Sequence, residues 1–351
     1  MSLSAASLLW IALLPGQADP GPGPSGLSPL FGPEDPLTLT VETPWVELTY
    51  RPESGRSRDA RVFVGPPGGE LGPIRASVAV RGKSRLAVCD FPPLTLRLAA
   101  DQVAGTLFEA DRQVHLTPRC KLPSEYLEIL ELELLAYRIF ALVSDAGLRT
   151  RRLDLVPARP GRKGRPSPVP AFLVEDLGLA AARSGLAWLQ PKATQLPSFD
   201  PDARALFALF QFLIGNTDWS IITGPPGEPC CHNAAIFGRP GSDSGWMPIP
   251  FDLDSAGLVD APYSVPGPRL GIKSTRERLY RGHCDLDRRR LEDAIARFER
   301  ARPAIFALVE GSERLKSRAK KRAVEFLTGF FEIVTDPERL AEEVLARCRE
   351  R

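Results

Sequence analysis

FALFQFLIGNTDWS (residues 207–220) begins the most informative part of this 351-residue sequence, which continues with CCHNAAIF (230–237) and WMPIPFDLDSAG (246–257). Apolar residues recur at helical spacing up to Ile214, so we expect a buried helix that ends near Gly215. Asp218 would then lie in the loop that follows this helix. A strand is predicted over 246–249, just before PFDLD. The order along the chain is therefore helix, Asp, Asn, strand, Asp.

Acidic and amide side chains in this part of the sequence have the chemistry that phosphoryl transfer requires. One carboxylate must orient the attacking hydroxyl, while an amide oxygen and a second carboxylate hold the magnesium ions that bridge the nucleotide phosphates. Asp218 suits the first role, and Asn233 with Asp252 or Asp254 suits the second. The alternative interpretation is that these are ordinary loop residues, because Asp and Asn are common wherever a chain turns.

The same residues carry a resemblance to known proteins. The series IGNTDWS, HN and PFDLDSAG resembles the catalytic half of atypical protein-kinase-like proteins of the spore-coat CotH group and of HipA-type bacterial kinases, over roughly 81–266. The resemblance implies that Asp218 is the catalytic-loop Asp and Asn233 the metal-binding Asn. It implies that Asp252 or Asp254, with a slight preference for Asp252, is the Asp of the DFG element. The gap from Asp218 to Asn233 is longer than in ordinary kinases, so a folded-back loop must return Asn233 to the site.

The segment before this stretch supplies candidates for contacts to the nucleotide. The basic loop RGKSR (81–85) and the strand containing Arg97 resemble the start of the family's nucleotide-binding lobe. Both offer cations to phosphates, although a solvated hairpin would carry the same residues. Glu133, in a predicted helix, resembles the glutamate that anchors the phosphate-binding cation. VPAFLVED (169–176) occupies the place of the kinase hinge that holds adenine, which puts Glu175 at the boundary between two lobes.

His115 is the clearest departure from the family pattern. It lies in a predicted strand, 113–117, where the resemblance leads us to expect a lysine. A histidine is only partly charged at neutral pH and reaches less far than lysine toward the α- and β-phosphates. Either Arg97, Arg119 or Lys121 supplies the cation instead, or the protein binds without transferring phosphate. A histidine with an ordinary structural role in a strand would look the same.

Composition places few limits on the partners. The 45 basic and 43 acidic side chains nearly cancel, so the net charge of +2 gives no reason to expect nucleic acid as a partner. Apolar residues make up 43% of the chain, which is enough for one large or two modest domains, and the 35 prolines indicate many rigid loops. Beyond the first residues no apolar run is long enough for a membrane span, so we expect no transmembrane helix.

The first residues have the pattern of an export signal. Residues 5–14 are apolar and are followed by Gly16-Gln17-Ala18, which suits a signal peptide over 1–18. A positively charged start is missing, so an unstructured start or a misassigned initiation site is the alternative. Residues 19–36 form a Pro/Gly-rich linker. The prediction is therefore a periplasmic or extracellular protein, or a cytoplasmic one if the first segment is not a signal.

Six cysteines occur in the sequence, at positions 89, 120, 230, 231, 284 and 348. In an exported protein they would pair as disulfides, but fifteen pairings are possible and the sequence does not choose among them. Zinc is a rival interpretation, because Cys230-Cys231-His232 and His283-Cys284 contain two of the three histidines. Adjacent cysteines chelate one metal poorly, which favours a local disulfide at Cys230 or Cys231 over zinc.

Periodicity predicts strands over 37–41, 45–50, 74–80, 95–98, 113–117, 148–156 and 169–176, and helices over 123–145, 200–214, 287–309, 312–334 and 337–349. With the resemblance, these elements predict an α+β, two-lobed, protein-kinase-like fold. Its β-rich N-lobe, with one long helix, would cover 37–175, and its helical C-lobe, with the catalytic and metal-binding loops, would cover 176–351.

The expected function is an ATP- and Mg-dependent phosphotransferase that passes the γ-phosphate to an unidentified hydroxyl acceptor, either a protein or a small molecule. No P-loop, Rossmann glycine series or G-x-S-x-G elbow points to another enzyme class. The alternative is a catalytically inactive, kinase-like binding or coat-type structural protein. The sequence does not identify the acceptor or the oligomeric state.

Overall fold

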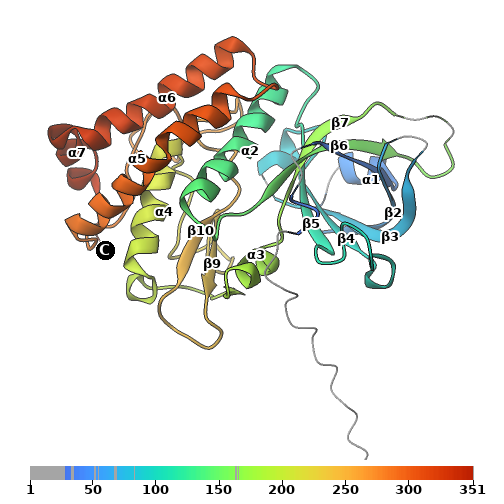
Figure 1. Cartoon of the computed structure of the whole chain (residues 1–351), viewed down its shortest axis with the longest axis horizontal. Coiled ribbons are helices and arrows are strands. Elements are labelled where there is room, and N and C mark those ends of the chain that lie inside the picture. Colours follow the sequence, from blue (N-terminus) through green and yellow to red (C-terminus); the bar gives the residue numbers. More distant parts are fainter. Residues whose placement is uncertain are drawn as a thin grey trace, which may run out of the picture.

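The structure is a computed structural model that describes residues 28–350, except for 33–34, 51–52, 54, 67–68, 83, 163 and 165. The predicted signal peptide and most of the predicted linker therefore lie outside the described residues. Figure 1 shows a strand-rich part beside a part that consists mainly of helices.

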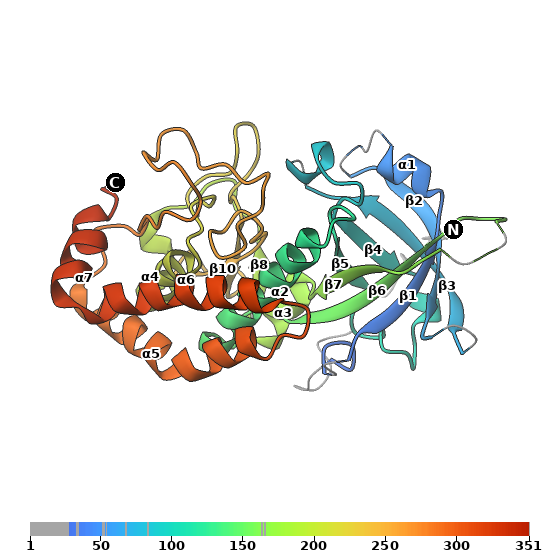
Figure 2. The ribbon, with the colours of Figure 1, turned by 90° about the horizontal axis from the view of Figure 1, so that it is seen from above.

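Strands in the first half of the described chain form a closed barrel (Figure 2). They are β1 (Leu37–Glu42), β2 (Ser57–Val64), β3 (Leu71–Val80), β4 (Leu94–Leu98), β5 (Gln113–Pro118), β6 (Thr150–Ala158) and β7 (Val169–Val174). Around the barrel their order is β1-β2-β3-β4-β5-β7-β6. A parallel pairing closes it, with Leu37 opposite Leu153 and Glu42 opposite Ala158, while the other neighbours are antiparallel.

The closed barrel contradicts the predicted two-lobed protein-kinase-like fold. The N-terminal sheet has no free edge at β1, because the polar backbone groups of β1 pair with β6. The C-terminal part also departs from the predicted helical lobe. It contains a three-stranded antiparallel sheet in the order β10-β9-β8, formed by β8 (Ala187–Leu189), β9 (Ala234–Gly238) and β10 (Met247–Pro250). The observed architecture is thus a mixed seven-stranded barrel joined to helices and a small sheet.

The barrel interior is filled by alternating apolar residues, as period-two side-chain geometry requires. Fully or almost fully buried examples are Leu39, Val62, Leu96, Val114, Leu153, Leu155 and Leu173. The strand predicted over 45–50 is wrong, because this segment is the short helix α1 (Trp45–Thr49). Val46, Leu48 and Tyr50 alternate as strand residues do, but Val46 and Tyr50 are exposed. The buried residues are Trp45 and Leu48, whose i, i+3 spacing places them on one face of a helix. The indole Nε1 of Trp45 donates to the carbonyl oxygen of Val41 at 2.9 Å.

Apart from α1, the α-helices of the described chain gather beside the barrel (Figure 1). They are α2 (Glu125–Val143), α3 (Leu177–Arg183), α4 (Pro201–Ile214), α5 (Arg288–Glu310), α6 (Ser317–Thr335) and α7 (Pro337–Glu343), with 3-10 turns η1 (Ser84–Ala87), η2 (Ala100–Gln102), η3 (Leu196–Ser198) and η4 (Leu345–Arg347). Helix α2 contacts both β6 and β7 of the barrel and also α5, so it joins the two parts. Within the described residues, none of the helices is both long enough and apolar enough to cross a membrane.

Helix α4 confirms the prediction made for the central stretch. The carboxylate of Asp200 caps its start by accepting a hydrogen bond from the Ala203 N–H at 2.7 Å. The helix ends at Gly215, whose φ of +64° is the left-handed conformation that favours glycine at a helix end. A Cβ at Gly215 would lie 2.7 Å from Cζ of Phe326 in α6. The loop that carries Asp218 therefore begins at a fixed point.

All six cysteines are paired, as Cys89–Cys120, Cys230–Cys231 and Cys284–Cys348. The cysteine sulfur atoms that the zinc interpretation takes as ligands are therefore all in disulfides. The local pair at Cys230–Cys231 lies at the end of the loop that leads back to Asn233.

Candidate functional site

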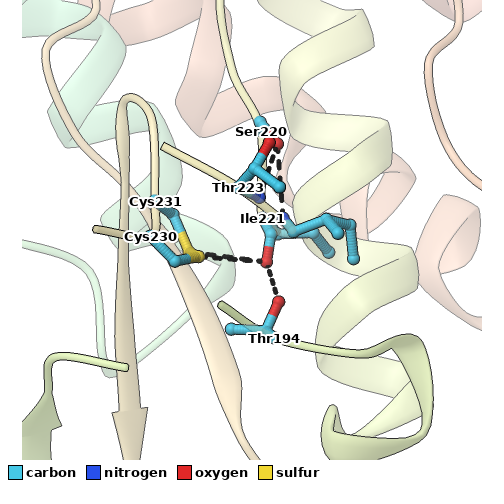
Figure 3. Close-up of a disulfide and its surroundings, with 7 residues drawn as sticks. Thr194, Ser220, Ile221, Thr223, Cys230 and Cys231 are labelled. Carbon is cyan, nitrogen blue, oxygen red and sulfur yellow. Dashed lines mark hydrogen bonds between the residues drawn. A yellow bond between two sulfur atoms is a disulfide. The ribbon is translucent and has the colours of Figure 1, made fainter. Parts of the chain in front are cut away.

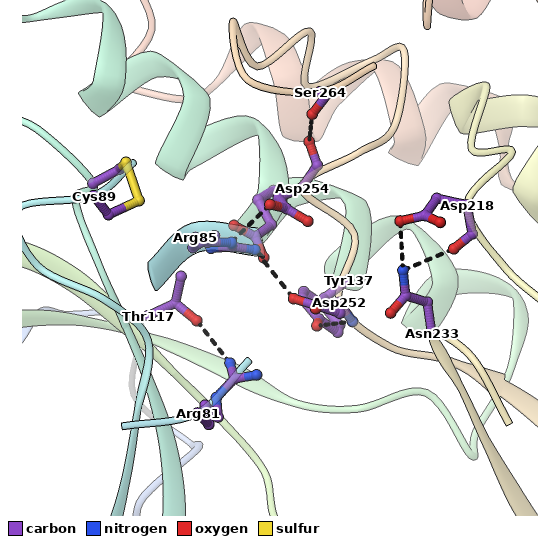
Figure 4. Close-up of polar contacts among 12 residues, drawn as sticks. Arg81, Arg85, Cys89, Thr117, Tyr137, Asp218, Asn233, Asp252, Asp254 and Ser264 are labelled. Carbon is purple, nitrogen blue, oxygen red and sulfur yellow. Dashed lines mark hydrogen bonds and ion pairs between the residues drawn. A yellow bond between two sulfur atoms is a disulfide. The ribbon is translucent and has the colours of Figure 1, made fainter. Parts of the chain in front are cut away.

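The guanidinium of Arg85 lies at the centre of a group of carboxylates (Figure 4). Its Nη2 lies 2.6 Å from Oε1 of Glu133 and 3.2 Å from Oδ1 of Asp252, and its Nε lies 2.7 Å from Oδ2 of Asp254. The side chains of Arg85, Glu133 and Asp254 are 6%, 2% and 4% exposed, whereas that of Asp252 is 24% exposed. One buried cation thus joins α2 to the loop after β10.

Local structure fixes the backbone that carries Arg85. It lies in η1, and its carbonyl oxygen accepts hydrogen bonds from the backbone N–H groups of Val88 and Cys89. The Cys89–Cys120 disulfide ties this turn to the segment after β5, and the Asp90 N–H donates to the Cys120 carbonyl at 2.9 Å. Arg85 is therefore held from the barrel side of the site.

Burial dominates the acid–base properties of this cluster. It raises the pKa of Glu133 to about 7, although Arg85 opposes the shift. Burial raises the pKa of Asp254 in the same way. For Arg85, burial acts to lower the pKa, but the carboxylates of Asp254 and Glu133 outweigh it and raise the pKa well above the usual value. The guanidinium therefore stays charged, and the buried carboxylates depend on it for their charged forms.

Two tyrosines complete this cluster. The backbone N–H of Asp252 donates to Oη of Tyr137 at 2.9 Å, and the phenol of Tyr263 is hydrogen-bonded to Asp254. Burial raises the pKa of both phenols, so both stay protonated near neutral pH. Asp252 has a φ of +55°, which is uncommon for a residue with a side chain, and the Tyr137 hydrogen bond helps to hold it there.

A second polar group surrounds Asp218 in the loop after α4. Its Oδ1 lies 2.8 Å from Nε2 of His232, and its Oδ2 accepts a hydrogen bond from Nδ2 of Asn233 at 3.0 Å. The same Asn233 nitrogen donates to the backbone oxygen of Asp218 at 2.7 Å. The loop before Asn233 thus folds back onto Asp218, as its sequence separation required.

The pKa values of Asp218 and His232 move apart. Burial acts to raise the pKa of Asp218, but the hydrogen bond and charge of His232 outweigh burial, so the pKa is lowered. The hydrogen bond to Asp218 raises the pKa of His232, against the effect of burial. Asp218 is therefore an ionised carboxylate near neutral pH.

The β9–β10 hairpin brings the two polar groups together. Ala234 pairs with Pro250, so Asn233 and Asp252 emerge from the same end of the hairpin. The Phe251 N–H donates to the Asn233 carbonyl oxygen at 3.2 Å. Because Asn233 directs its Nδ2 at Asp218, its amide oxygen remains for another partner.

A cavity of about 290 Å³ adjoins Asn233. Its walls include Leu177, Trp188, Phe251 and the Cys230–Cys231 disulfide. Most of these groups are apolar, so the cavity offers an apolar surface next to the polar cluster. Leu177 begins α3, two residues after Glu175.

The other predicted nucleotide contacts lie outside the Arg85 cluster. The Glu175 carboxylate forms an ion pair with Arg183, at 2.8 Å between Oε2 and Nη2, and accepts a hydrogen bond from the Arg149 N–H at 3.1 Å. Arg97 is exposed on β4, where it pairs with Gln113 of β5.

His115 lies on β5, and its ring packs edge-on against Phe251 with 5.8 Å between the ring centroids. Its Nδ1 lies 3.3 Å from Oγ1 of Thr95. Burial lowers the pKa of His115 to about 3, with Arg81 and Arg97 adding to the shift, so the ring is neutral. It therefore brings no positive charge to the site near neutral pH.

Sequence reasoning missed the central position of Arg85. The only signal was its place in the basic loop RGKSR, a few residues before Cys89. His232 was quoted in the HN motif and weighed as a zinc ligand, but its contact with Asp218 was not predicted. The contributions of Tyr137 and Tyr263 had no visible signal, because aromatic residues in apolar segments usually belong to the core.

Comparison of the chain with models of known protein families gave no match, and comparison with curated proteins gave none either.

Proposed function

We propose that the protein is an ATP- and magnesium-dependent phosphotransferase that acts on a hydroxyl acceptor. The observation that carries the proposal is the meeting of Asp218, Asn233 and Asp252 at one end of the β9–β10 hairpin, beside the Arg85–Glu133 pair. These residues come from separate segments and supply a carboxylate base, an amide oxygen, a metal-type carboxylate and a cation. Phosphoryl transfer needs that set of groups.

The residues around Asn233 fit a magnesium ion. The described residues contain no group of three or more His, Cys, Asp or Glu side chains arranged to hold a metal. Magnesium, however, often takes only one or two carboxylates and completes its shell with water and phosphate oxygens. Asn233 and Asp252 would hold it, and Asp252 suits this role better than Asp254, which is almost fully buried against Arg85. Bound magnesium would neutralise charge on the transferred phosphate.

Each remaining residue has a separate task in the proposal. Asp218 orients the acceptor hydroxyl and accepts its proton, which requires the ionised form that its lowered pKa favours. Arg85, anchored by Glu133, places a permanent positive charge beside the phosphates, the role expected of the missing lysine. The apolar cavity beside Asn233 would take the base of the nucleotide.

A non-catalytic binding or coat-type structural protein is the second candidate. It is favoured by the neutral His115 at the expected lysine position and by the contacts that Arg85 makes with Asp252 and Asp254, which neutralise these carboxylates without a metal. The three disulfides support export under either function, because disulfides persist in oxidising compartments.

Formation of ADP from ATP by the purified protein tests the proposal. We expect turnover that requires magnesium and that falls at least about 100-fold in Asp218→Asn, because removing a general base typically costs that much. Asp243→Asn is a matched control, since Asp243 is exposed in the turn between β9 and β10, away from the site. Turnover that persists in Asp218→Asn, or that is absent from the wild type, would favour the second candidate.

A further inference from the structure

The segment Cys230–Asn233 packs against the loop that carries Asp218. Ser220 and His232 form an isolated antiparallel bridge, with Ser220 N–H donating to the His232 carbonyl at 2.9 Å and His232 N–H donating to the Ser220 carbonyl at 3.0 Å. The backbone of His232 is therefore fixed opposite Ser220, which lies two residues after Asp218. This bridge therefore helps to place the His232 imidazole next to the Asp218 carboxylate.

The disulfide adds a second set of contacts (Figure 3). The sulfur atoms of Cys230 and Cys231 lie 3.5 and 3.4 Å from the carbonyl oxygen of Ile221, which also accepts a hydrogen bond from the Thr194 hydroxyl. The Cys230 N–H donates to the Lys192 carbonyl oxygen at 3.0 Å. The backbone just before His232 is thus held by groups from two other segments.

The two donors from this segment engage both oxygens of Asp218. An ionised carboxylate only accepts hydrogen bonds, so the Nε2 of His232, 2.8 Å from Oδ1, must carry the hydrogen. Nδ2 of Asn233 donates to Oδ2 at 3.0 Å. With one donor on each oxygen, the plane of the carboxylate is fixed, and its remaining lone pairs point in set directions.

We propose that His232 is a positioning residue that holds the Asp218 carboxylate in the orientation needed to receive the proton of the acceptor hydroxyl. The inference rests on the proposed phosphotransfer and adds to it a residue that acts through Asp218. Without the Nε2 donor, the carboxylate rotates between orientations of which only some are productive. A loss of orientation lowers the rate of the chemical step and leaves nucleotide binding unaffected.

Two variants of equal side-chain length test this role. His232→Gln keeps an N–H donor near the position of Nε2, whereas His232→Met fills similar space without a donor. Steady-state phosphate release from Mg-ATP, with water as the acceptor, gives kcat and KM for each. We expect kcat of His232→Met to fall about 10-fold with KM for Mg-ATP within about twofold of wild type, and kcat of His232→Gln to stay within about threefold.

The outcomes separate the two proposals. Suppose that the wild type is active. The positioning role is then overturned if kcat of His232→Met is unchanged, if only its KM changes, or if both variants lose equal activity. The proposed phosphotransferase function would stand in each of these cases. A folded wild type without magnesium-dependent turnover would overturn both. Thermal unfolding of both variants checks that the comparison is made between folded proteins, and His232→Leu, which also lacks a donor, replaces the Met variant if that variant does not fold.

Discussion

At the scale of single residues, Arg85 is the side chain on which the site depends most. It is buried among Glu133, Asp252 and Asp254, and it is the cation that contacts all three. Removing one partner of a buried ion pair leaves an uncompensated charge in a poorly solvated place. Arg85 therefore has a structural role, which can be measured separately from the role proposed for it in the site.

Replacing Arg85 should destabilise the protein. We expect Arg85→Met to lower the free energy of unfolding by about 3–5 kcal/mol, because Glu133 and Asp254 lose their buried partner. Arg97→Met, at an exposed position on β4, should change it by less than about 0.5 kcal/mol. Urea unfolding of both variants at pH 7 measures the difference. Equal, small effects would show that the Arg85 cluster does not stabilise the fold.

The neutral His115 predicts a pH dependence of stability. Its pKa is about 3 in the folded chain and near 6.5 when exposed, so between these values the unfolded chain binds more protons. Its contribution to stability is present above about pH 6.5 and is lost as the pH falls toward 3. The difference in unfolding free energy between pH 7 and pH 4.5 should therefore be smaller in His115→Gln than in wild type. The same difference in both proteins would contradict a His115 that is neutral in the folded chain.

At the scale of elements, the end of α4 decides where Asp218 lies. Gly215 closes the helix in a left-handed conformation, and its Cα faces the ring of Phe326 in α6. The next segment is held by the Asn216 side chain, whose Oδ1 accepts the Asp218 N–H at 2.9 Å. A side chain at Gly215 would thus disturb both the helix end and the site.

A matched pair of glycine substitutions tests this. Gly185→Ala, at φ +69° with open space around it, should cost only about 1 kcal/mol of unfolding free energy for the left-handed backbone. Gly215→Ala should cost about 1–3 kcal/mol more, because its Cβ would meet Phe326 Cζ at 2.7 Å. Thermal or urea unfolding gives both values. If the two variants lose equal stability, the close approach to Phe326 is unimportant.

Local elements were predictable from the sequence, whereas their pairing was not. Apolar periodicity and Gly215 predicted α4, and alternation predicted most barrel strands, because both signals depend on neighbouring residues. The parallel β1–β6 pairing that closes the barrel joins strands more than a hundred residues apart, and no local pattern encodes it. Segment 45–50 was misassigned because Val46, Leu48 and Tyr50 alternate as in a strand, although the residues that the fold buries are Trp45 and Leu48.

The candidate site was also predictable only in part. Asp218, Asn233 and Asp252 or Asp254 were proposed as site residues from their chemistry and order, and the structure brings Asp218 and Asn233 into direct contact. The cation was not identified, because Arg85 lies 48 residues from Glu133 and 169 residues from Asp254 in the sequence. Ion pairs over such separations follow from the fold and leave no local signal.

At the scale of the whole molecule, the barrel and the C-terminal part each supply half of the site. The barrel side contributes Arg85, and the loops around β9 and β10 contribute Asn233 and Asp252, while Glu133 on α2 lies between them. Helix α2 contacts both parts and therefore helps to hold them in a fixed relative position. A nucleotide bound at this junction would contact both parts and should stabilise them together.

Calorimetric titration of the wild-type protein with ATP, with and without magnesium, tests the central proposal most directly. We expect magnesium-dependent binding that weakens at least about 10-fold in Asp252→Asn, which loses a charged metal ligand, and that is unchanged in the control Asp243→Asn at the far end of the same hairpin. Binding that is absent from the folded wild type, or is equal with and without magnesium and in both variants, would contradict a magnesium–nucleotide site.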